Sequence, residues 1–168
     1  EVHFLYQQSF KSYDTAIADQ IITASADRVS PACDVFGQCG GCSLQHMTHQ
    51  KQLQHKMTVL TEQLFHFGQL QPQEWVAPLH ASPWGYRSKA RLGVRYVRKK
   101  ESVLIGFREL NGRFITQMNR CETLIPEVGD YLDEIKQLVA SLTIFREIAQ
   151  IEVIGGDNQT GLIFRHLV

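Results

Sequence analysis

The four cysteines of this chain fall into one pattern that is typical of metal ligands. Cys33, Cys39 and Cys42 lie close together in the sequence, and Cys121 follows much later. Thiolates are soft ligands that favour iron-sulfur clusters, zinc or copper(I). Three close cysteines with a distant fourth are common for iron-sulfur cubanes, whereas a four-cysteine zinc site is usually built from two close pairs. The spacing therefore predicts a [4Fe-4S] cluster bound by all four cysteines.

Two other interpretations of the cysteines stay open at this point. A zinc ion could recruit His46 or His49, which follow the cysteine loop at short spacing. Two disulfides would need an oxidising compartment, and the chain shows no signal peptide that would indicate one. Gly40 and Gly41 separate two of the cysteines. We expect them to adopt positive φ and to bring backbone amides close to the sulfurs.

Charge is distributed unevenly along the chain, although the formal net charge is zero. Between Trp84 and Arg113 the net charge is +7, so the remainder carries −7. A local cationic segment in a neutral protein favours a polyanionic partner, and nucleic acid is the most common one. The basic residues of this segment are Arg87, Lys89, Arg91, Arg95, Arg98, Lys99, Lys100, Arg108 and Arg113.

The first half of the chain predicts a hairpin, a helix and a linker. Alternating residues indicate strands over 2–7 and 12–23, which we interpret as the last hairpin of a small barrel. Apolar residues at helical spacing predict an amphipathic helix over 53–67 that ends at Gly68 and buries one face beneath the cysteine loop. Three prolines then indicate an extended linker over 72–83. No run of eighteen apolar residues occurs, so we expect no membrane span.

The second half predicts an antiparallel sheet with one helix. Between residues 87 and 97, apolar side chains alternate with basic ones, so one face of this strand is expected to be cationic. Further strands are expected over 102–108 and 114–118, followed by a helix from Pro126 to Leu142. A closing hairpin is expected over 149–154 and 162–167. The basic face would contact the phosphates of a single RNA strand through Arg87, Lys89, Arg91 and Arg95.

Four sequence blocks in this order resemble a known family. They are Cys33-Asp-Val-Phe-Gly-Gln-Cys39-Gly-Gly-Cys42-Ser-Leu-Gln-His46, then Pro83-Trp84-Gly85-Tyr86-Arg87-Ser88-Lys89-Ala90-Arg91, then Gly106-Phe107-Arg108, then Cys121. Together they are similar to the bacterial 23S ribosomal RNA (uracil-5-)-methyltransferases of the RlmD (RumA) type. The predicted elements together give an α+β fold, an antiparallel sheet with two main helices and a cysteine loop, and the resemblance implies that the hairpin before them is the remnant of an OB-type (TRAM) barrel. Residues 1–25 would end the TRAM domain, and 26–168 would form the central iron-sulfur, RNA-binding domain.

The resemblance also implies a function for the parent enzyme. Such enzymes methylate uracil C5 with S-adenosylmethionine, which the absent catalytic domain would bind, so this fragment alone is expected to be inactive. The partner would be unfolded or single-stranded 23S rRNA, contacted by a monomeric cytoplasmic protein that does not associate with membranes. Two alternatives remain: a zinc-stapled nucleic-acid binding domain and an iron-sulfur electron-transfer module. The expected RNA contacts are Trp84, Tyr86, Arg87, Lys89, Arg91, Arg95 and Arg108.

Overall fold

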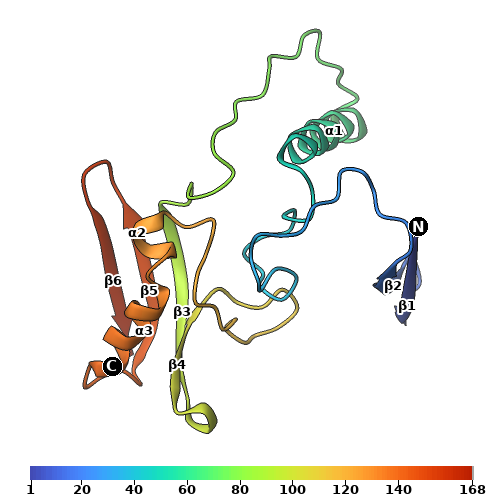
Figure 1. Cartoon of the computed structure of the whole chain (residues 1–168). Coiled ribbons are helices and arrows are strands. Elements are labelled where there is room, and N and C mark those ends of the chain that lie inside the picture. Colours follow the sequence, from blue (N-terminus) through green and yellow to red (C-terminus); the bar gives the residue numbers. More distant parts are fainter. Residues whose placement is uncertain (168) are drawn as a thin grey trace.

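A four-stranded antiparallel sheet organises the second half of the chain in the computed structural model, which describes residues 1–167. The strand order is β4-β3-β5-β6, and two helices lie on one face of this sheet (Figure 1). The predicted α+β class is confirmed. The elements are β3 (Lys89–Val97), β4 (Ser102–Gly106), α2 (Pro126–Gly129), α3 (Leu132–Ser141), β5 (Ile148–Gly155) and β6 (Thr160–His166).

The core lies between this sheet and its helices. On β3, Leu92 and Val94 are buried while Arg91 and Arg95 are exposed, so the predicted alternation of the strand is confirmed. One face therefore supplies apolar packing and the opposite face supplies charge. The largest fully buried side chains come from the sheet, from the helices and from the segments that join them: Leu92, Ile105, Leu124, Leu132, Ile151, Val128, Val139, Val153 and Thr116.

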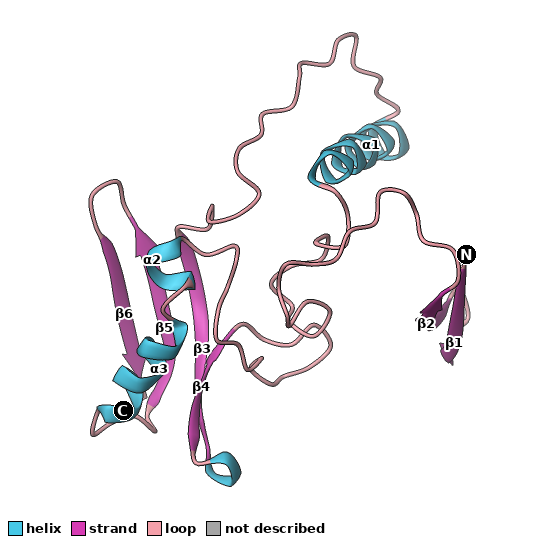
Figure 2. Ribbon diagram, viewed as in Figure 1, coloured by secondary structure: helices cyan, strands magenta, loops and turns pink. Residues whose placement is uncertain are grey.

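The first half of the chain is more extended (Figure 2). β1 (Val2–Ser9) and β2 (Asp14–Ile21) form a two-stranded hairpin whose residues are all exposed. α1 (His49–Gly68) follows the cysteine loop and contains no buried residue within the described chain. The expectation that α1 buries a face beneath the cysteine loop is therefore wrong. Near its start, the Gln52 side-chain amide donates to the carbonyls of Leu44 and Met47 at 3.0 Å, which ties α1 to the segment that follows the cysteine loop.

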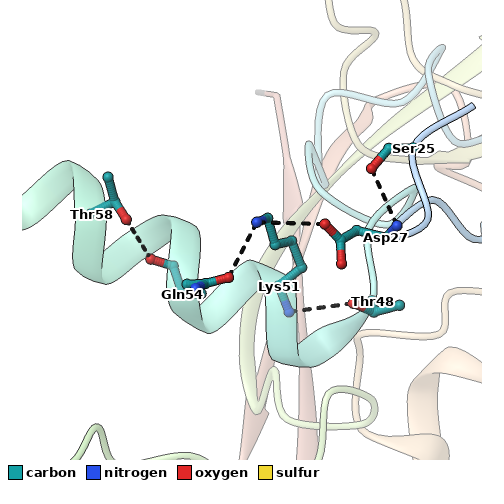
Figure 3. A network of polar contacts seen from close by, with 6 residues as sticks. All are labelled: Ser25, Asp27, Thr48, Lys51, Gln54 and Thr58. Atoms are coloured by element: carbon teal, nitrogen blue, oxygen red, sulfur yellow. Dashed lines mark hydrogen bonds and ion pairs between the residues drawn. The ribbon is translucent and has the colours of Figure 1, made fainter.

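Polar contacts fix the start of α1 (Figure 3). The Thr48 hydroxyl accepts a hydrogen bond from the Lys51 amide at 3.3 Å, which satisfies one of the free amides at the helix N-terminus. The Lys51 ammonium lies 3.5 Å from a carboxylate oxygen of Asp27 and donates to the Gln54 side chain at 3.2 Å. Because the Thr48 amide also donates to the Asp27 carbonyl, the helix start is tied to the segment after the hairpin.

Two predicted elements differ from the structure. Residues 114–118 form a single bridge, Arg108 with Ile115, instead of a strand. This segment crosses Gly93 and Gly106, where a side chain would collide with Ile115 and with the Thr116 carbonyl. The expected helix over 126–142 is divided into α2 and α3 near Asp130.

The division between α2 and α3 has a specific cause. The Gly129 carbonyl accepts a hydrogen bond from the Cys121 amide at 3.0 Å, and a Cβ at Gly129 would collide with the Cys121 carbonyl. The helix end is thus occupied by the segment that carries the fourth cysteine. No helix in the described part of the chain is long and apolar enough to cross a bilayer.

We predict that Gly129→Ala lowers the free energy of unfolding by about 1–3 kcal/mol, since the new methyl group meets backbone that must shift. Gly161→Ala is the matched control, because the nearest atom to its added Cβ lies at 3.9 Å. Urea unfolding followed by circular dichroism measures both. Equal stability of the two variants would show that the contact between Gly129 and Cys121 is not tight.

Candidate functional site

The cysteine loop lies against the segment that follows β4. The Gly40 amide donates to the Arg108 carbonyl at 2.8 Å, and the Leu110 amide donates to the Gln38 carbonyl at 2.8 Å. Cys39 forms an antiparallel bridge with Glu109 between these two bonds. Backbone hydrogen bonds therefore hold two segments together that are far apart in the sequence.

The glycine pair permits this close approach. A Cβ at Gly40 would lie 3.0 Å from the Arg108 carbonyl oxygen, and one at Gly41 would lie 3.1 Å from the Phe107 ring. Neither glycine has positive φ, so that expectation is wrong; the left-handed glycine of the loop is Gly37, at φ 89°. The expected amide near a sulfur is confirmed at Gly41, whose N–H donates to the Cys39 sulfur at 3.4 Å.

All four cysteines are free thiols in one neighbourhood. Cys39 and Cys121 are buried, each 6% exposed, and Cys33 and Cys42 are half-buried. Burial raises the pKa of the Cys33 thiol; a hydrogen bond with the Val35 backbone opposes this effect, and the charges of the other three thiolates raise the pKa further. Groups that influence one another in this way lie within the range of direct electrostatic interaction.

Burial also raises the pKa of the Cys39 thiol, against the opposing hydrogen bond from the Gly41 amide. Within residues 1–167, no three histidine, cysteine, aspartate or glutamate side chains are arranged to hold a single metal ion. The assignment of the four cysteines as cluster ligands therefore stays a prediction. His46 packs near the Phe36 ring instead, with the ring centres 5.7 Å apart.

The segment that leads into β3 holds the chain just after Cys121. Beyond it, the Thr123 carbonyl accepts a hydrogen bond from the Arg87 amide at 2.8 Å, and Leu124 forms a parallel bridge with Arg87. The Thr123 hydroxyl lies 3.5 Å from the Cys121 sulfur and 4.0 Å from the Cys42 sulfur. Thr123 thus stands between one cysteine of the loop and the distant cysteine.

Arg87 joins the cysteine loop to the sheet. Its guanidinium donates to the Gly41 carbonyl at 3.2 Å and lies over the Phe107 ring, 5.2 Å from the ring centre. The side chain is half-buried by these contacts. Arg87 therefore has a structural partner already, and its predicted contact with phosphates is not tested by the structure.

A cationic groove runs beside β3 on the exposed face of the sheet. It has a volume of about 1270 Å³, and none of the described residues that line it is acidic. One of its walls is the segment after β4, where Phe114 is 64% exposed and the Arg113 guanidinium lies 5.8 Å from its ring centre. The basic side chains that line this cationic groove are Arg91, Arg95, Arg98, Lys99, Arg108 and Arg113.

The charge of the groove is partly neutralised at one end. Glu152 on β5 lies 3.6 Å from Arg91 and 2.7 Å from Arg165. Glu152 pairs with Arg91 across the sheet, so the expected cationic face of β3 has an acidic neighbour at Arg91 that the sequence of this strand alone does not indicate. The Arg165 hydrogen bond lowers the pKa of Glu152, which keeps this carboxylate charged.

A second cavity, of about 510 Å³, lies at the cysteine loop. Trp84 and Tyr86 line it together with Gly41, Cys42 and His49. Both aromatic side chains are exposed, by 39% and 57%. This loop cavity therefore contains flat apolar surfaces and polar groups within one concave site.

The predicted RNA contacts thus divide between two places. Arg91, Arg95 and Arg108 lie in the cationic groove, whereas Trp84 and Tyr86 lie in the loop cavity. Lys89 is exposed on β3 and is not among the residues that line either of them. The prediction missed the groove residues Arg98, Lys99, Arg113 and Phe114. The sequence shows that basic residues gather around two turns, but it does not show that both turns lie beside the same strand.

Comparison with known proteins identifies relatives over almost the whole chain. This chain is 49% identical over 167 residues to the 23S rRNA (uracil(1939)-C(5))-methyltransferase RlmD of Alcanivorax borkumensis. The alignment covers 99% of this chain and 38% of that protein. Proteins of the same name from Nitrosococcus oceani and Francisella tularensis subsp. novicida are 46% and 44% identical to this chain. Both alignments cover 99% of this chain, and they cover 38% and 37% of the two relatives, respectively. No protein-family model matches. The predicted resemblance is confirmed, and the chain spans about 38% of the length of these relatives.

We predict that Arg87→Lys lowers the free energy of unfolding by about 1 kcal/mol, because lysine cannot keep both the hydrogen bond to Gly41 and the stacking on Phe107. Arg95→Lys is the control, since Arg95 is exposed in the groove. Urea unfolding gives both values. If the two substitutions are equally mild, Arg87 does not support the cysteine loop.

Proposed function

We propose that this chain, the counterpart of about 38% of these methyltransferases, is the RNA-binding part of a 23S rRNA uracil-C5 methyltransferase that forms 5-methyluridine. The observation that carries the proposal is the cationic groove: six basic side chains line it without an acidic one among the described residues. The relatives are named for a reaction on 23S rRNA, and a groove of this charge suits that substrate.

Electrostatics explains how the groove would bind RNA. Each phosphate neutralised by arginine or lysine releases condensed counterions, so affinity falls as salt concentration rises. Arg95, Arg108 and Arg113 are exposed and would contact the backbone, which fixes the position of the strand without reading its sequence. Phe114, exposed on the groove wall, offers a face on which a base can stack.

The loop cavity would receive an unpaired base of the same RNA. Sequence-specific recognition of RNA mostly uses bases that leave the stack and pack on aromatic side chains. Trp84 and Tyr86 provide such surfaces beside the cysteine loop. The proposed substrate is therefore a single-stranded or unfolded segment of ribosomal RNA, with its backbone in the groove and a base in the cavity.

The four cysteines would hold a [4Fe-4S] cluster. The donor set is four soft thiols, the Gly41 amide points at one sulfur, and glycines keep the loop close to its support, all of which suit this group. Because burial raises the pKa of two of these thiols, cluster binding would release protons from them. Methyl transfer to uracil is redox-neutral, so the cluster would serve to fix the loop.

Catalysis would take place in the rest of the parent enzyme. Attack on uracil C6 needs a cysteine nucleophile, and every thiol of this chain is assigned to the cluster. S-adenosylmethionine would be bound by the parent's catalytic domain. We therefore propose that this chain alone does not methylate RNA, that residues 1–25 are the end of a TRAM domain, and that 26–168 form the central domain. Val168 lies outside the described residues.

We predict that Arg95→Ala with Arg113→Ala weakens binding of a single-stranded rRNA oligonucleotide and reduces the slope of log affinity against log salt by about one to two. Fluorescence anisotropy at several salt concentrations measures this slope. The control, Lys11→Ala with Arg120→Ala, makes the same charge change outside the groove. A matching loss in the control variant would mean that net charge, and not the groove, determines binding.

We predict that anaerobically purified protein contains iron and acid-labile sulfide in near-equal amounts, about four of each per chain, as a cubane requires. The Cys121→Ser variant should lose most of the iron and of the sulfide, although it keeps the other three cysteines. Metal analysis and the visible spectrum provide the measurement. Zinc at one ion per chain without sulfide would instead support the zinc-stapled domain.

A further inference from the structure

A small recess opens in the sheet where two of its strands part. The pairing of β3 with β5 ends at Gly93 and Gln150, whereas β3 continues along β4 as far as Val97. The last residues of β3 therefore have a partner strand on one side only. A cavity of about 280 Å³ lies on the open side, between the end of β3 and the segment that leads into β5. We call this cavity the strand-end recess.

The strand-end recess borders the cationic groove and continues its charge. Arg95 and Arg98 line both cavities. The recess adds Arg146, which belongs to the segment between α3 and β5. Glu147 also lines the recess, so three arginines stand against one carboxylate. The charge of the lining therefore favours an anion.

Two aromatic rings hold the Arg146 guanidinium. It lies 5.2 Å from the centre of the Tyr96 ring and 5.1 Å from the centre of the Phe145 ring, within the range of a cation–π contact. The two rings pack edge to face with their centres 5.0 Å apart, and both lie against the buried core. This aromatic pair positions the guanidinium before any ligand binds.

The charge of Arg146 is not neutralised by the protein. Its guanidinium forms no ion pair with another side chain in residues 1–167, and the residue is exposed. Arg91 and Arg165, by contrast, share the carboxylate of Glu152. Stacking on a ring leaves the N–H groups at the edge of a guanidinium available, and these donors match the oxygens of a phosphate in pairs.

We propose that the strand-end recess binds a backbone phosphate of the RNA strand where that strand leaves the cationic groove, with Arg146 and Arg98 as its ligands. The inference rests on the proposed function of the groove and extends the RNA-contacting surface around the end of β3. A phosphate contact at this place fixes the course of the strand without reading its sequence. Only an RNA long enough to fill the groove and the recess together would use it.

The test measures single-stranded RNA oligonucleotides of increasing length by fluorescence anisotropy at several salt concentrations. Arg146→Ala removes the proposed ligand, and Arg146→Lys keeps the charge but loses the planar fork. Arg28→Ala is the matched control, because Arg28 is exposed and lines neither the groove nor the recess. Urea unfolding establishes that each variant is folded.

We expect Arg146→Ala to leave the binding of the shortest oligonucleotides unchanged. For the longer ones it should lower affinity about tenfold, as the loss of one charged hydrogen-bonded contact implies. It should also reduce the slope of log affinity against log salt by about 0.7, the value for one phosphate of a single strand. Arg146→Lys should keep this slope and lose part of the affinity. Should Arg146→Ala fail to fold, Arg146→Lys is compared with the unmodified protein, and equal affinity would contradict the proposal.

Three other results would also contradict the proposal, each in a different way. If Arg146→Ala behaves like Arg28→Ala with the longer oligonucleotides, the strand-end recess is not a phosphate site. If the affinity falls while the salt slope stays the same, Arg146 stacks on a base, and the phosphate assignment is wrong. If Arg95→Ala with Arg113→Ala leaves binding unchanged at every length, the proposed RNA-binding function of the groove is itself wrong.

Discussion

The close backbone contact between the cysteine loop and the segment after β4 is the constraint on which the site depends. Three of the cysteines and the fourth are separated by almost eighty residues that include α1 and the extended linker (Figure 1). Local propensity cannot bring them together. Hydrogen bonds from the Gly40 and Leu110 amides hold the loop against the segment after β4, and the absence of side chains at Gly40 and Gly41 leaves room for this approach. Any residue larger than glycine at Gly40 would push against a carbonyl oxygen of the partner segment.

Phe107 and Arg87 connect the cysteine site to the cationic groove. The Phe107 ring lies against Gly41 and beneath the Arg87 guanidinium, and Phe107 also lines the groove. A group that organises the cysteine loop would therefore also organise one wall of the surface proposed to hold RNA. The proposed cluster would in this way stiffen one wall of the proposed RNA surface through the Phe107 ring.

Residue patterns predicted the elements well where the signal is local. The C-terminal end of α1 at Gly68 and the alternation along β3 were predicted because side-chain periodicity follows directly from helix and strand geometry, whereas α1 begins at His49, four residues before the expected start. The break at Gly129 and the missing strand at 114–118 were not, since both arise from contacts with distant backbone. The same limit applies to the site. Cysteine spacing indicated the thiols, but Arg87 as a structural contact and Glu152 as a neighbour of Arg91 depend on which strands pair.

Burial also explains why an accurate helix prediction gave the wrong packing for α1. Its apolar residues recur at helical spacing, yet the helix has no buried residue in the described chain and is held mainly by its cap and by Asp27. An isolated helix or two-stranded hairpin is only marginally stable in water. The sheet with α2 and α3, by contrast, has a continuous buried core. Periodicity therefore specifies which face of a helix can be buried, whereas the surface that covers it must be supplied by other parts of a protein. The relatives extend well beyond the length of this chain, so such a surface has room to exist in them.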